Sequence, residues 1–366
     1  MTGAHATTVS GMDWSLFLIH AQPPGMDAHD VIENGVQYAV AGERLGFSTA
    51  WVLEHHFTQF GLVGSPLFHA SFLLGRTTTL KVGTAIQVIT LDHPVRLAEQ
   101  VALLDHLSNG RLIFGFGRGY FVKDFVVFEK DRHKTREIAD EWLAIMKSAW
   151  TTGRCSADSE HLRFPQIHVH PRPLTRPHPP LYTVAQTDQT IEWAATRGIP
   201  LLLPFGFSDQ QTLDILNRYN AFADKAGIDA SGLPHVLTAL AGVSSDGARI
   251  KDTARERILW WEEASQRAMQ FGETLVSERY GRRPGEETVW GGTSLFGKVD
   301  AYLANSPIGT PAECIDKLNR TAEVTGIRRI ALALEGVGPR QAVLDSMQQF
   351  AEEVMPHVRP PLRPGR

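Results

Sequence analysis

The sequence predicts an α/β fold, a (β/α)8 barrel, on two observations. Short apolar and β-branched runs alternate with longer helical patterns along the whole chain, and this alternation is typical of βαβ units on a parallel sheet. Eight such runs are present, which is the number of strands that closes a barrel, and 366 residues are compatible with one large barrel domain. The predicted strands are Trp14–Ile19, Thr49–Glu54, Leu80–Ile89, Arg111–Gly117, Pro180–Ala185, Ile199–Pro204, His235–Val243 and Ile327–Leu334.

Two of the segments between these strands carry clear helix signals. One begins with Pro94 and ends at Asn109-Gly110, a favoured first residue and a favoured left-handed cap. In the other, Thr310 and Glu313 have the spacing of a capping box, and Gly326 follows the last turn. Both segments are therefore expected to be helices.

Two segments interrupt the rhythm and divide the predicted domain. The barrel is expected over residues 14–358, after an extension (1–13) and before a tail (359–366), with insertions at about 155–179 and 271–307. Long insertions in barrels often serve the mouth at the carboxyl ends of the strands. We expect the second one to be a mobile lid, with glycine hinges (Gly281, Gly285, Gly291, Gly292, Gly297), cations for an anionic ligand (Arg282, Arg283, Lys298) and apolar plugs (Trp290, Phe296).

The composition is that of an ordinary soluble globular protein. Hydrophobic residues make up 43% and charged residues 21%, and the formal net charge of −4 suggests no polyanionic partner such as nucleic acid. The first residues lack the pattern of a signal peptide, and no apolar run approaches the length of a membrane span. Cys155 and Cys314 form no C-x-x-C pair. A cytoplasmic protein with reduced thiols is expected.

The second predicted strand ends in an unusual group, Glu54-His55-His56. Successive side chains of a strand point to opposite faces, so only one of the two histidines is expected to enter the barrel mouth. A histidine there suits acid/base work because its pKa lies near neutrality, but a hydrogen-bonded packing role is equally compatible with the pattern. Glu54 is expected to anchor a histidine or a backbone amide.

Polar residues also follow other strands, where catalytic groups of such barrels lie. Arg118 stands beside glycines in "GFGRGY", and Thr187 and Thr190 stand at the start of the next helix. Free N–H groups at a helix start and an arginine can bind a phosphate. The alternative is that Thr187 only caps its helix and Arg118 pairs with a carboxylate. No G-x-G-x-x-G follows a strand, so a built-in dinucleotide site is not expected.

His168 and His170 are the candidate metal ligands of the sequence. The "HVH" pattern resembles paired ligands of metal-dependent barrel hydrolases. It lies in a proline-rich insertion instead of a strand end, and no further ligands recur at a suitable spacing. We therefore expect no metal.

Longer motifs carry a resemblance to a known family. The stretches "EHHFTQFGLVGSP", "TLKVGTAIQVITLDHPVRLAEQVALLDHLSNGRLIFGFGRGYFVKDFVVF", "IEWAATRGIP" and "NSPIGTPAECI" together resemble the luciferase-like flavin-dependent monooxygenases, in particular the α subunit of bacterial luciferase. The resemblance runs from about Trp14 to Pro356. It implies a barrel of the bacterial luciferase type that holds reduced FMN at its mouth and uses O2 as co-substrate.

The resemblance also implies roles for individual residues. His55 matches the catalytic histidine, and Asp124, His93 and Glu335 fall on positions of the active region. A non-proline cis peptide is implied between Ala85 and Ile86. The phosphate-binding positions of the flavin are matched by Arg118, Thr187 and Thr190, and the other cofactor-binding positions are expected at Gly117, Tyr120, Gln186 and Phe205.

Three departures from luciferase make light emission doubtful. Gly117 replaces a reactive cysteine, Gln186 a glutamate and Phe205 a tryptophan. The missing cysteine side chain is expected to free volume beside the flavin. Aromatic walls suit a flat polycyclic substrate. Phe116, Phe121, Phe207, Trp290 and Glu335 are expected to line the substrate site, although several of these phenylalanines are equally compatible with the core.

The leading functional hypothesis is a two-component monooxygenase. A separate NAD(P)H:flavin reductase would supply FMNH2, and one oxygen atom of O2 would enter an organic substrate by hydroxylation, epoxidation or Baeyer–Villiger oxidation. The alternatives are luciferase-type oxidation of a long-chain aldehyde, an F420-dependent oxidoreductase and a non-catalytic partner subunit. A homodimer is expected, through a helical stripe formed by Leu67, Ala70, Ser71 and Leu74.

Overall fold

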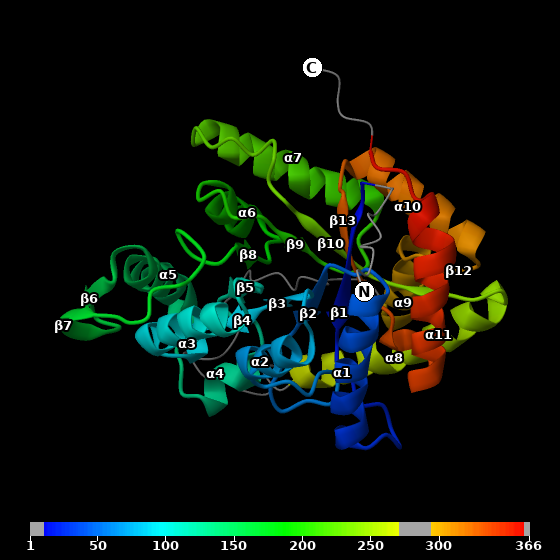
Figure 1. Ribbon diagram of the computed structural model, residues 1–366, viewed down its shortest axis with the longest axis horizontal. Coiled ribbons are helices and arrows are strands. Elements are labelled where there is room, and N and C mark those ends of the chain that lie inside the picture. Colours follow the sequence, from blue (N-terminus) through cyan, green and yellow to red (C-terminus); the bar gives the residue numbers. More distant parts are fainter. Residues whose placement is uncertain (1–10, 271–293, 362–366) are drawn as a thin grey trace, which may run out of the picture.

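The computed structural model of the protein, which describes residues 11–270 and 294–361, confirms the barrel. Parallel pairing runs from β8 through β5, β3, β2, β1, β13 and β10 to β9, and a parallel bridge between Thr183 and Leu201 joins the two ends of this series. The helices surround the strands (Figure 1). The barrel strands are β1 (Asp13–Leu18), β2 (Thr49–Val52), β3 (Lys81–Thr84), β5 (Leu112–Gly117), β8 (Leu181–Thr183), β9 (Leu202–Leu203), β10 (Val236–Leu240) and β13 (Arg329–Ala333).

All eight predicted runs contain a barrel strand, but two of them are not continuous. The run Leu80–Ile89 is divided into β3 and β4 (Gln87–Val88) at the cis peptide between Ala85 and Ile86, which the family resemblance implied. The run His235–Val243 is divided into β10 and β11, and β11 (Gly242–Val243) pairs with β12 (Ile308–Gly309) outside the barrel. Periodicity alone did not reveal these breaks.

The two predicted helix signals are confirmed. Pro94 is the first residue of α3, and the capping box of Thr310 and Glu313 opens α10, which ends at Gly326 with a φ of 73°. The helices are α1 (Ala28–Arg44), α2 (Pro66–Arg76), α3 (Pro94–Leu107), α4 (Val122–Val127), α5 (Thr135–Thr152), α6 (Asp188–Ala195), α7 (Asp209–Lys225), α8 (Gly247–Gln270), α9 (Leu295–Asn305), α10 (Pro311–Thr325) and α11 (Arg340–Gln349). Short 3-10 turns occupy Ile89–Leu91, Arg132–Lys134, Glu335–Val337 and Met355–His357, and Phe350–Val354 is a π turn.

Large aromatic side chains fill the interior of the barrel, and glycines on neighbouring strands make room for them. The rings of Trp51 and Tyr182 lie 5.2 Å apart, edge to face. A Cβ atom on Gly83 would lie 2.4 Å from Trp51, and one on Gly115 would lie 2.0 Å from the Thr84 carbonyl oxygen. Any side chain at either position would therefore collide with the packed interior.

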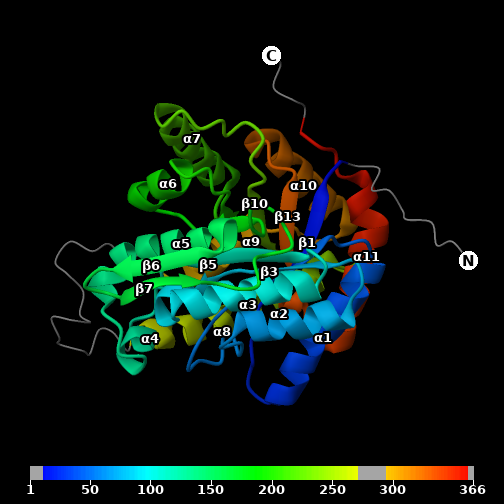
Figure 2. The same cartoon turned by 60° about the vertical axis from the view of Figure 1, so that its left-hand side comes forward.

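The first insertion contains a β-hairpin that lies against α5. Its strands are β6 (Arg154–Asp158) and β7 (Arg163–His168), and Figure 2 shows it in front of α5. At the hairpin tip, Lys134 donates to Glu160 at 2.6 Å. Beyond the hairpin, near the end of the insertion, the backbone N–H of Thr175 donates to the Asp105 carboxylate at 2.7 Å, next to the start of β5. The insertion therefore spans the length of the barrel wall.

The second insertion is only partly described, and its described part is mainly helical. Ser294 caps α9, so Gly297 lies in the first turn of a helix instead of a hinge. Lys298 is buried and faces Glu262, 3.7 Å away, and so does not hold a ligand at the rim. Phe296 is 67% exposed. Trp290, Arg282, Arg283 and the other expected hinge glycines lie outside the described residues.

The predicted dimerisation stripe on α2 is wrong, because it faces the interior of its own chain. Leu67, Ala70 and Leu74 are buried, and of the four residues only Ser71 is exposed. The apolar side chains exposed on this side belong to other positions of α2 and its neighbour α3, which lie side by side (Figure 2). They are Phe68, Phe72, Leu103 and Leu107.

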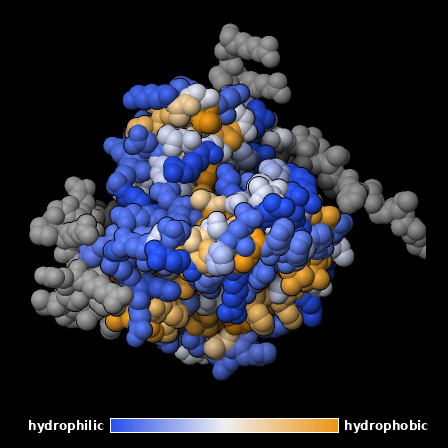
Figure 3. Space-filling view, turned by 90° about the vertical axis from the view of Figure 1, so that its left-hand side faces the viewer, coloured by the Kyte–Doolittle hydropathy of each residue, from blue (hydrophilic) through white to orange (hydrophobic). Residues whose placement is uncertain are grey.

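The surface is otherwise mixed. Figure 3 shows the side of the molecule that lies at the left of Figure 1. This side is largely hydrophilic, with apolar groups near its lower edge. None of the helices in the described ranges is both long and apolar enough to cross a bilayer.

Candidate active site

The site begins where β2 ends, at the Glu54-His55-His56 group. Glu54 is buried; it accepts a hydrogen bond from the Val88 N–H at 2.8 Å and contacts His56 Nε2 at 3.0 Å. Val88 belongs to β4, which pairs with the end of β5. Glu54 thus anchors both a histidine and a backbone amide, and it ties the ends of three strands together.

The group around His56 is built of carboxyls with raised pKa values. Burial raises the pKa of Glu54 to about 7 and that of Asp124 to about 6, because a charged carboxylate is poorly solvated there. Burial also opposes protonation of His56, but the hydrogen bond to Glu54 and the nearby carboxyls of Asp124 and Asp92 outweigh it and raise the His56 pKa. This cluster can therefore exchange a proton near neutral pH.

His55 has the opposite electrostatic character. Burial, followed by the neighbouring His56, lowers its pKa to about 3, so the imidazole is neutral at neutral pH. Its ring lies among aromatic rings, 4.4 Å from Phe60 and 5.4 Å from Phe121. Within the described residues its Nδ1 is shielded from solvent and has no hydrogen-bond partner. A neutral imidazole with an unused nitrogen can still donate or accept one proton.

Gly61 explains how His55 keeps this place. A Cβ atom on Gly61 would lie 2.6 Å from His55 Cδ2 and 3.3 Å from the Ile19 carbonyl oxygen. The loop after β2 therefore closes over the histidine only with a glycine at this position. The same loop brings His55 next to the end of β1.

A cationic pocket lies at the end of β5, and we call it the β5 pocket. Its space, including the part open to solvent, is about 480 Å³. Among the described residues, Arg118 and Arg136 are its charged lining residues, and none of the lining side chains is a carboxylate. Arg136, on α5, has no hydrogen-bond or ion-pair partner in the described part of the chain. The other lining residues are Phe116, Gly117, Ala139, Thr183, Val184, Gln189, Thr190 and Trp193.

The first turn of α6 forms one side of this pocket. Thr187 caps the helix: its hydroxyl accepts from the Thr190 N–H at 3.4 Å, and Thr190 Oγ1 accepts from the N–H groups of Thr187 and Gln186 at 3.1 and 3.2 Å. The capping role expected as an alternative for Thr187 is therefore present, and a role in phosphate binding stays a prediction. Thr190 also lines the pocket, so the positive end of the helix faces the same space as the two arginines.

Gly117 does not leave the free volume expected from its replacement of a cysteine. A Cβ atom built on Gly117 would lie only 2.4 Å from Ile86 Cδ1. The Ile86 side chain fills the space instead. The cis peptide and Gly117 are thus packed against each other at the end of β5.

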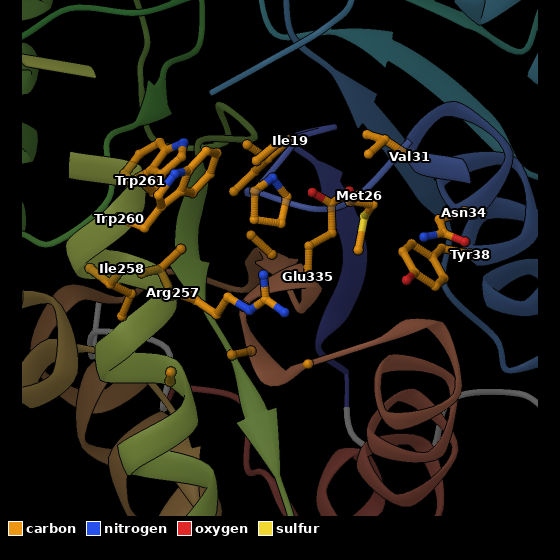
Figure 4. Close-up of a pocket in the computed structure, with 18 of the residues that line it drawn as sticks. Ile19, Met26, Val31, Asn34, Tyr38, Arg257, Ile258, Trp260, Trp261 and Glu335 are labelled. Carbon is orange, nitrogen blue, oxygen red and sulfur yellow. The ribbon is translucent and has the colours of Figure 1, made fainter. Parts of the chain in front are cut away.

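A second and larger pocket lies at the ends of β1, β10 and β13 under α8, and we call it the β1 pocket (Figure 4). It encloses about 800 Å³. Most of its lining is apolar, and Ile19, Met26, Val31, Ile258, Trp260 and Trp261 are examples. Its polar lining residues are Asn34, Tyr38, Arg257 and Glu335. No residue lines both this pocket and the β5 pocket.

Glu335 lies in the β1 pocket as a structural anchor. It accepts a hydrogen bond from the backbone N–H of His20 at 2.9 Å. Burial raises its pKa to about 7, although the hydrogen bonds from the backbone at positions 19–21 oppose that rise. Glu335 therefore fixes the loop after β1 that forms one wall of the pocket.

Trp261 connects the β1 pocket with His55. Its indole N–H donates to the Phe60 carbonyl oxygen at 3.2 Å, and its ring lies 6.2 Å from the Phe60 ring. Phe205, which was expected near the cofactor, lies 6.4 Å from Trp261 and 4.8 Å from Phe17. Four lining residues of the two pockets were not predicted as site residues, because they lie inside helical patterns and not at strand ends. They are Trp260, Trp261, Arg136 and Arg257.

The remaining predicted site residues are more dispersed. Phe116 is buried and stacked on Phe114 at 5.9 Å, so it belongs to the core as well as to the floor of the β5 pocket. His93 is exposed at the cap of α3, with its ring 6.4 Å from Phe164 of the hairpin, outside the buried cluster of His56. Tyr120 reaches α8, where its hydroxyl contacts Met269 at 3.7 Å.

The last two predicted substrate-site residues are Phe207 and Trp290. Phe207 is partly buried against the core, and Trp290 lies outside the described residues. His168 and His170 form the HVH pattern of the sequence. Both side chains are exposed, and their rings lie 6.4 Å apart. In the described ranges the one group of three residues spaced to hold a metal is Glu137, Glu160 and His161, at the hairpin tip.

The barrel mouth carries a cationic pocket on one side and a mainly apolar pocket on the other. The sequence profile of the luciferase-like monooxygenases matches residues 12–329. The chain is 36% identical over 355 residues to the alkanal monooxygenase α chain of a Kryptophanaron alfredi symbiont, covering 95% of this chain and 99% of that one. The protein belongs to the luciferase-like monooxygenase family and is an enzyme of that class.

Two solved structures share the fold at low identity. The monooxygenase RslO1 from Streptomyces bottropensis superposes with a TM-score of 0.81 at 22% identity, over 94% of this chain and 99% of that one. The oxygenating component of 3,6-diketocamphane monooxygenase from Pseudomonas putida, solved with FMN, gives a TM-score of 0.74 at 16% identity, over 96% and 100% of the two chains.

Proposed function

We propose that the protein is the oxygenase of a two-component system, which takes reduced FMN from a separate reductase and inserts one atom of O2 into an organic substrate. The observation that carries this proposal is the β5 pocket. Two arginines, with no carboxylate among the described lining residues, and the first turn of α6 together match the charge of a phosphate monoester. Bound there, reduced FMN would supply the electrons that activate O2.

The protein residues then have separate tasks. Arg118 and Arg136 hold the phosphate, and the aromatic residues around His55 exclude water from the mouth. His55 keeps a neutral imidazole beside the reacting atoms and donates or accepts a hydrogen bond through Nδ1. The cluster of Glu54, His56 and Asp124 exchanges the proton that the reaction needs, because its pKa values lie nearer neutrality.

The proposal is tested by binding under anaerobic conditions. The purified chain is titrated with reduced FMN, reduced riboflavin and reduced F420, with flavin fluorescence or calorimetry as the readout. Reduced FMN should bind at least about 10-fold more tightly than riboflavin, because only FMN carries the phosphate. Equal affinity for both would remove the phosphate assignment, and preferential binding of F420 would establish the alternative hydride-transfer function.

Oxygen use separates an oxygenase from a non-catalytic subunit. With FMNH2 supplied by an added reductase, we expect the chain to consume O2 and to yield less H2O2 than free FMNH2 once an accepted substrate is present. Substrate candidates follow the three chemistries: a long-chain aldehyde, a cyclic ketone and a polycyclic phenol. If no candidate changes the ratio of product to H2O2, assignment as a catalytic oxygenase fails.

We also propose a homodimer, through the exposed apolar side chains of α2 and α3. Phe68 and Leu107 are 78% and 72% exposed, and Phe72 and Leu103 lie on the same two helices. A second copy of the chain would cover this surface. Light scattering should give twice the chain mass for the native protein and a monomer for Phe68→Asp; a native monomer at micromolar concentration would contradict the proposal.

A further inference from the structure

We propose that the β1 pocket binds the organic substrate as an anion with an apolar body, and that Arg257 is the residue that selects its negative charge. A carboxylate, phenolate or enolate oxygen would provide this charge. The inference rests on the proposed function, because it assigns the substrate to the side of the mouth opposite the β5 pocket.

The first support is the apolar character of the pocket. Ile19 comes from the end of β1, Met26 and Val31 from the chain before and within α1, and Trp260 and Trp261 from α8. Burial of an organic body against such walls is favourable by roughly 25 cal/mol for each Å² removed from water. The Trp261 ring also lies 6.2 Å from that of Phe60, which packs on His55, so one side chain, Phe60, separates this wall of the pocket from the proposed catalytic histidine.

The second support is the state of Arg257. Its side chain extends into the pocket from α8 (Figure 4). Among the described residues it has no ion-pair or hydrogen-bond partner. The neighbouring Arg255 differs, because it pairs with Asp300. A guanidinium that faces an apolar space without a counter-ion gains much from an anion, since charge-assisted bonds are strong where water is excluded.

The third support is that the carboxyl of the pocket is already engaged elsewhere. Among the described lining residues Glu335 is the one carboxyl, and it is bonded to the backbone after β1. Burial raises the Glu335 pKa to about 7, which reduces its average negative charge at neutral pH. Arg340, a nearby cation, is already bonded to Asn34 and lies 4.0 Å from Asp30. Arg257 is thus the cation that remains for a ligand.

The test uses two probes that differ in charge and share one ring system, 2-naphthoate and 2-naphthylmethanol. Their binding to the full chain is measured by calorimetry with and without saturating FMN. The variants are Arg257→Gln, which removes the charge, and Arg257→Lys, which keeps it. Arg255→Gln is the matched control on the same helix, and Arg118→Gln reports binding in the β5 pocket instead.

We expect naphthoate to bind the native protein at least about 10-fold more tightly than the alcohol, and Arg257→Gln to weaken naphthoate by about 10- to 100-fold. The same variant should change naphthylmethanol by less than about 3-fold, and Arg257→Lys should recover most of the naphthoate affinity. Arg255→Gln should leave both probes unchanged.

Three results would overturn the inference: equal affinities for the two probes, an unchanged naphthoate affinity in Arg257→Gln, or no naphthoate binding at millimolar concentration. Loss of naphthoate binding in Arg118→Gln alone would place the anion in the β5 pocket. The affinity for reduced FMN is measured on the same samples. Failure to bind FMN would refute the proposed function while leaving the result for Arg257 readable.

Discussion

The two pockets at the barrel mouth differ in how they are built. The β5 pocket is formed by the ends of β5 and β8 and by the starts of two helices, and its charge comes from Arg118 and Arg136. The β1 pocket is formed by strand ends covered by the middle of α8. It is larger and mostly apolar, and Arg257 is the one cation among its described lining residues. The first is suited to a small hydrophilic anion and the second to an organic body.

In the proposed function this difference separates the cofactor from the substrate. Backbone N–H groups and arginines at helix starts recognise a phosphate whatever the rest of the mouth contains. An apolar wall supplied by a single long helix can change its side chains without changing the strands beneath it. His55 contacts Phe121 after β5 and is connected, through Phe60, to Trp261 of the β1 pocket.

The largest expected effect comes from His55. His55→Asn should lower kcat by roughly 10²- to 10³-fold, because it removes the neutral imidazole that donates or accepts a hydrogen bond at the reacting atoms. Binding of reduced FMN and of naphthoate should change by less than about 3-fold. Rapid-mixing kinetics with FMNH2 and calorimetry measure the two properties. The exposed His29 provides a matched control, His29→Asn; a kcat that stays within about 3-fold in His55→Asn would exclude the catalytic role.

Arg118→Gln is expected to affect one pocket only. Loss of a charged hydrogen-bond donor should weaken reduced FMN by about 10- to 100-fold, and Arg136→Gln should act in the same direction. Riboflavin lacks the phosphate, so its affinity should stay the same in both variants. Arg163→Gln, on the exposed hairpin, is the control. Equal losses for FMN and riboflavin would mean that the arginines support the fold and not the phosphate.

Sequence alone predicted the barrel and four of the ten described residues that line the β5 pocket, namely Phe116, Gly117, Arg118 and Thr190. Strand ends such as Glu54-His55 and Gly117-Arg118 are recognisable because polar residues follow apolar runs, and the cis peptide at Ala85–Ile86 was implied by the family resemblance. The β1 pocket was missed apart from Glu335. Arg257 and Trp261 lie in an amphipathic helix, where a charged or aromatic residue is ordinary, and only the docking of α8 over the mouth gives them a common cavity.

The same limit explains the two wrong side-chain assignments. Helical spacing correctly grouped Leu67, Ala70 and Leu74 on one face of α2, but spacing does not say whether that face meets the core or another chain. Replacement of cysteine by Gly117 was expected to open space, yet the packing of Ile86 decides it. Both errors concern contacts between segments that the local sequence pattern does not encode.

The buried cluster beside His55 should show itself in the pH dependence of stability. The Asp124 pKa is about 6 in the folded protein and 3.8 in the unfolded chain. The folded state therefore holds this proton more strongly, and its contribution to stability is full below about pH 4 and is lost as pH rises through 6. Asp124→Asn, which stays neutral, should thus gain about 1–3 kcal/mol relative to the native protein between pH 4 and pH 8.

Urea unfolding at pH 4, 6 and 8 measures this change, with the exposed Asp158→Asn as the control. A difference between Asp124→Asn and the native protein that stays constant across these pH values would contradict a raised Asp124 pKa. This result would place the proton-exchanging group at Glu54 and His56 alone, without Asp124.

The smallest expected effect concerns the boundary of the β5 pocket, where Gly117 contacts Ile86. Gly117→Cys restores the residue of the luciferase α subunit, but its Cβ would meet Ile86 Cδ1 at 2.4 Å. The flexible end of Ile86 must then move toward the mouth, which should weaken reduced FMN by about 3- to 10-fold, in line with the modest cost of overpacking a movable side chain. Ile86→Ala in the same chain should restore the affinity, because the two residues compete for one space.

Calorimetry on the single and double variants measures this coupling. Purely additive effects would show that Ile86 does not occupy the volume left by the glycine, and naphthoate binding in the β1 pocket should stay unchanged throughout.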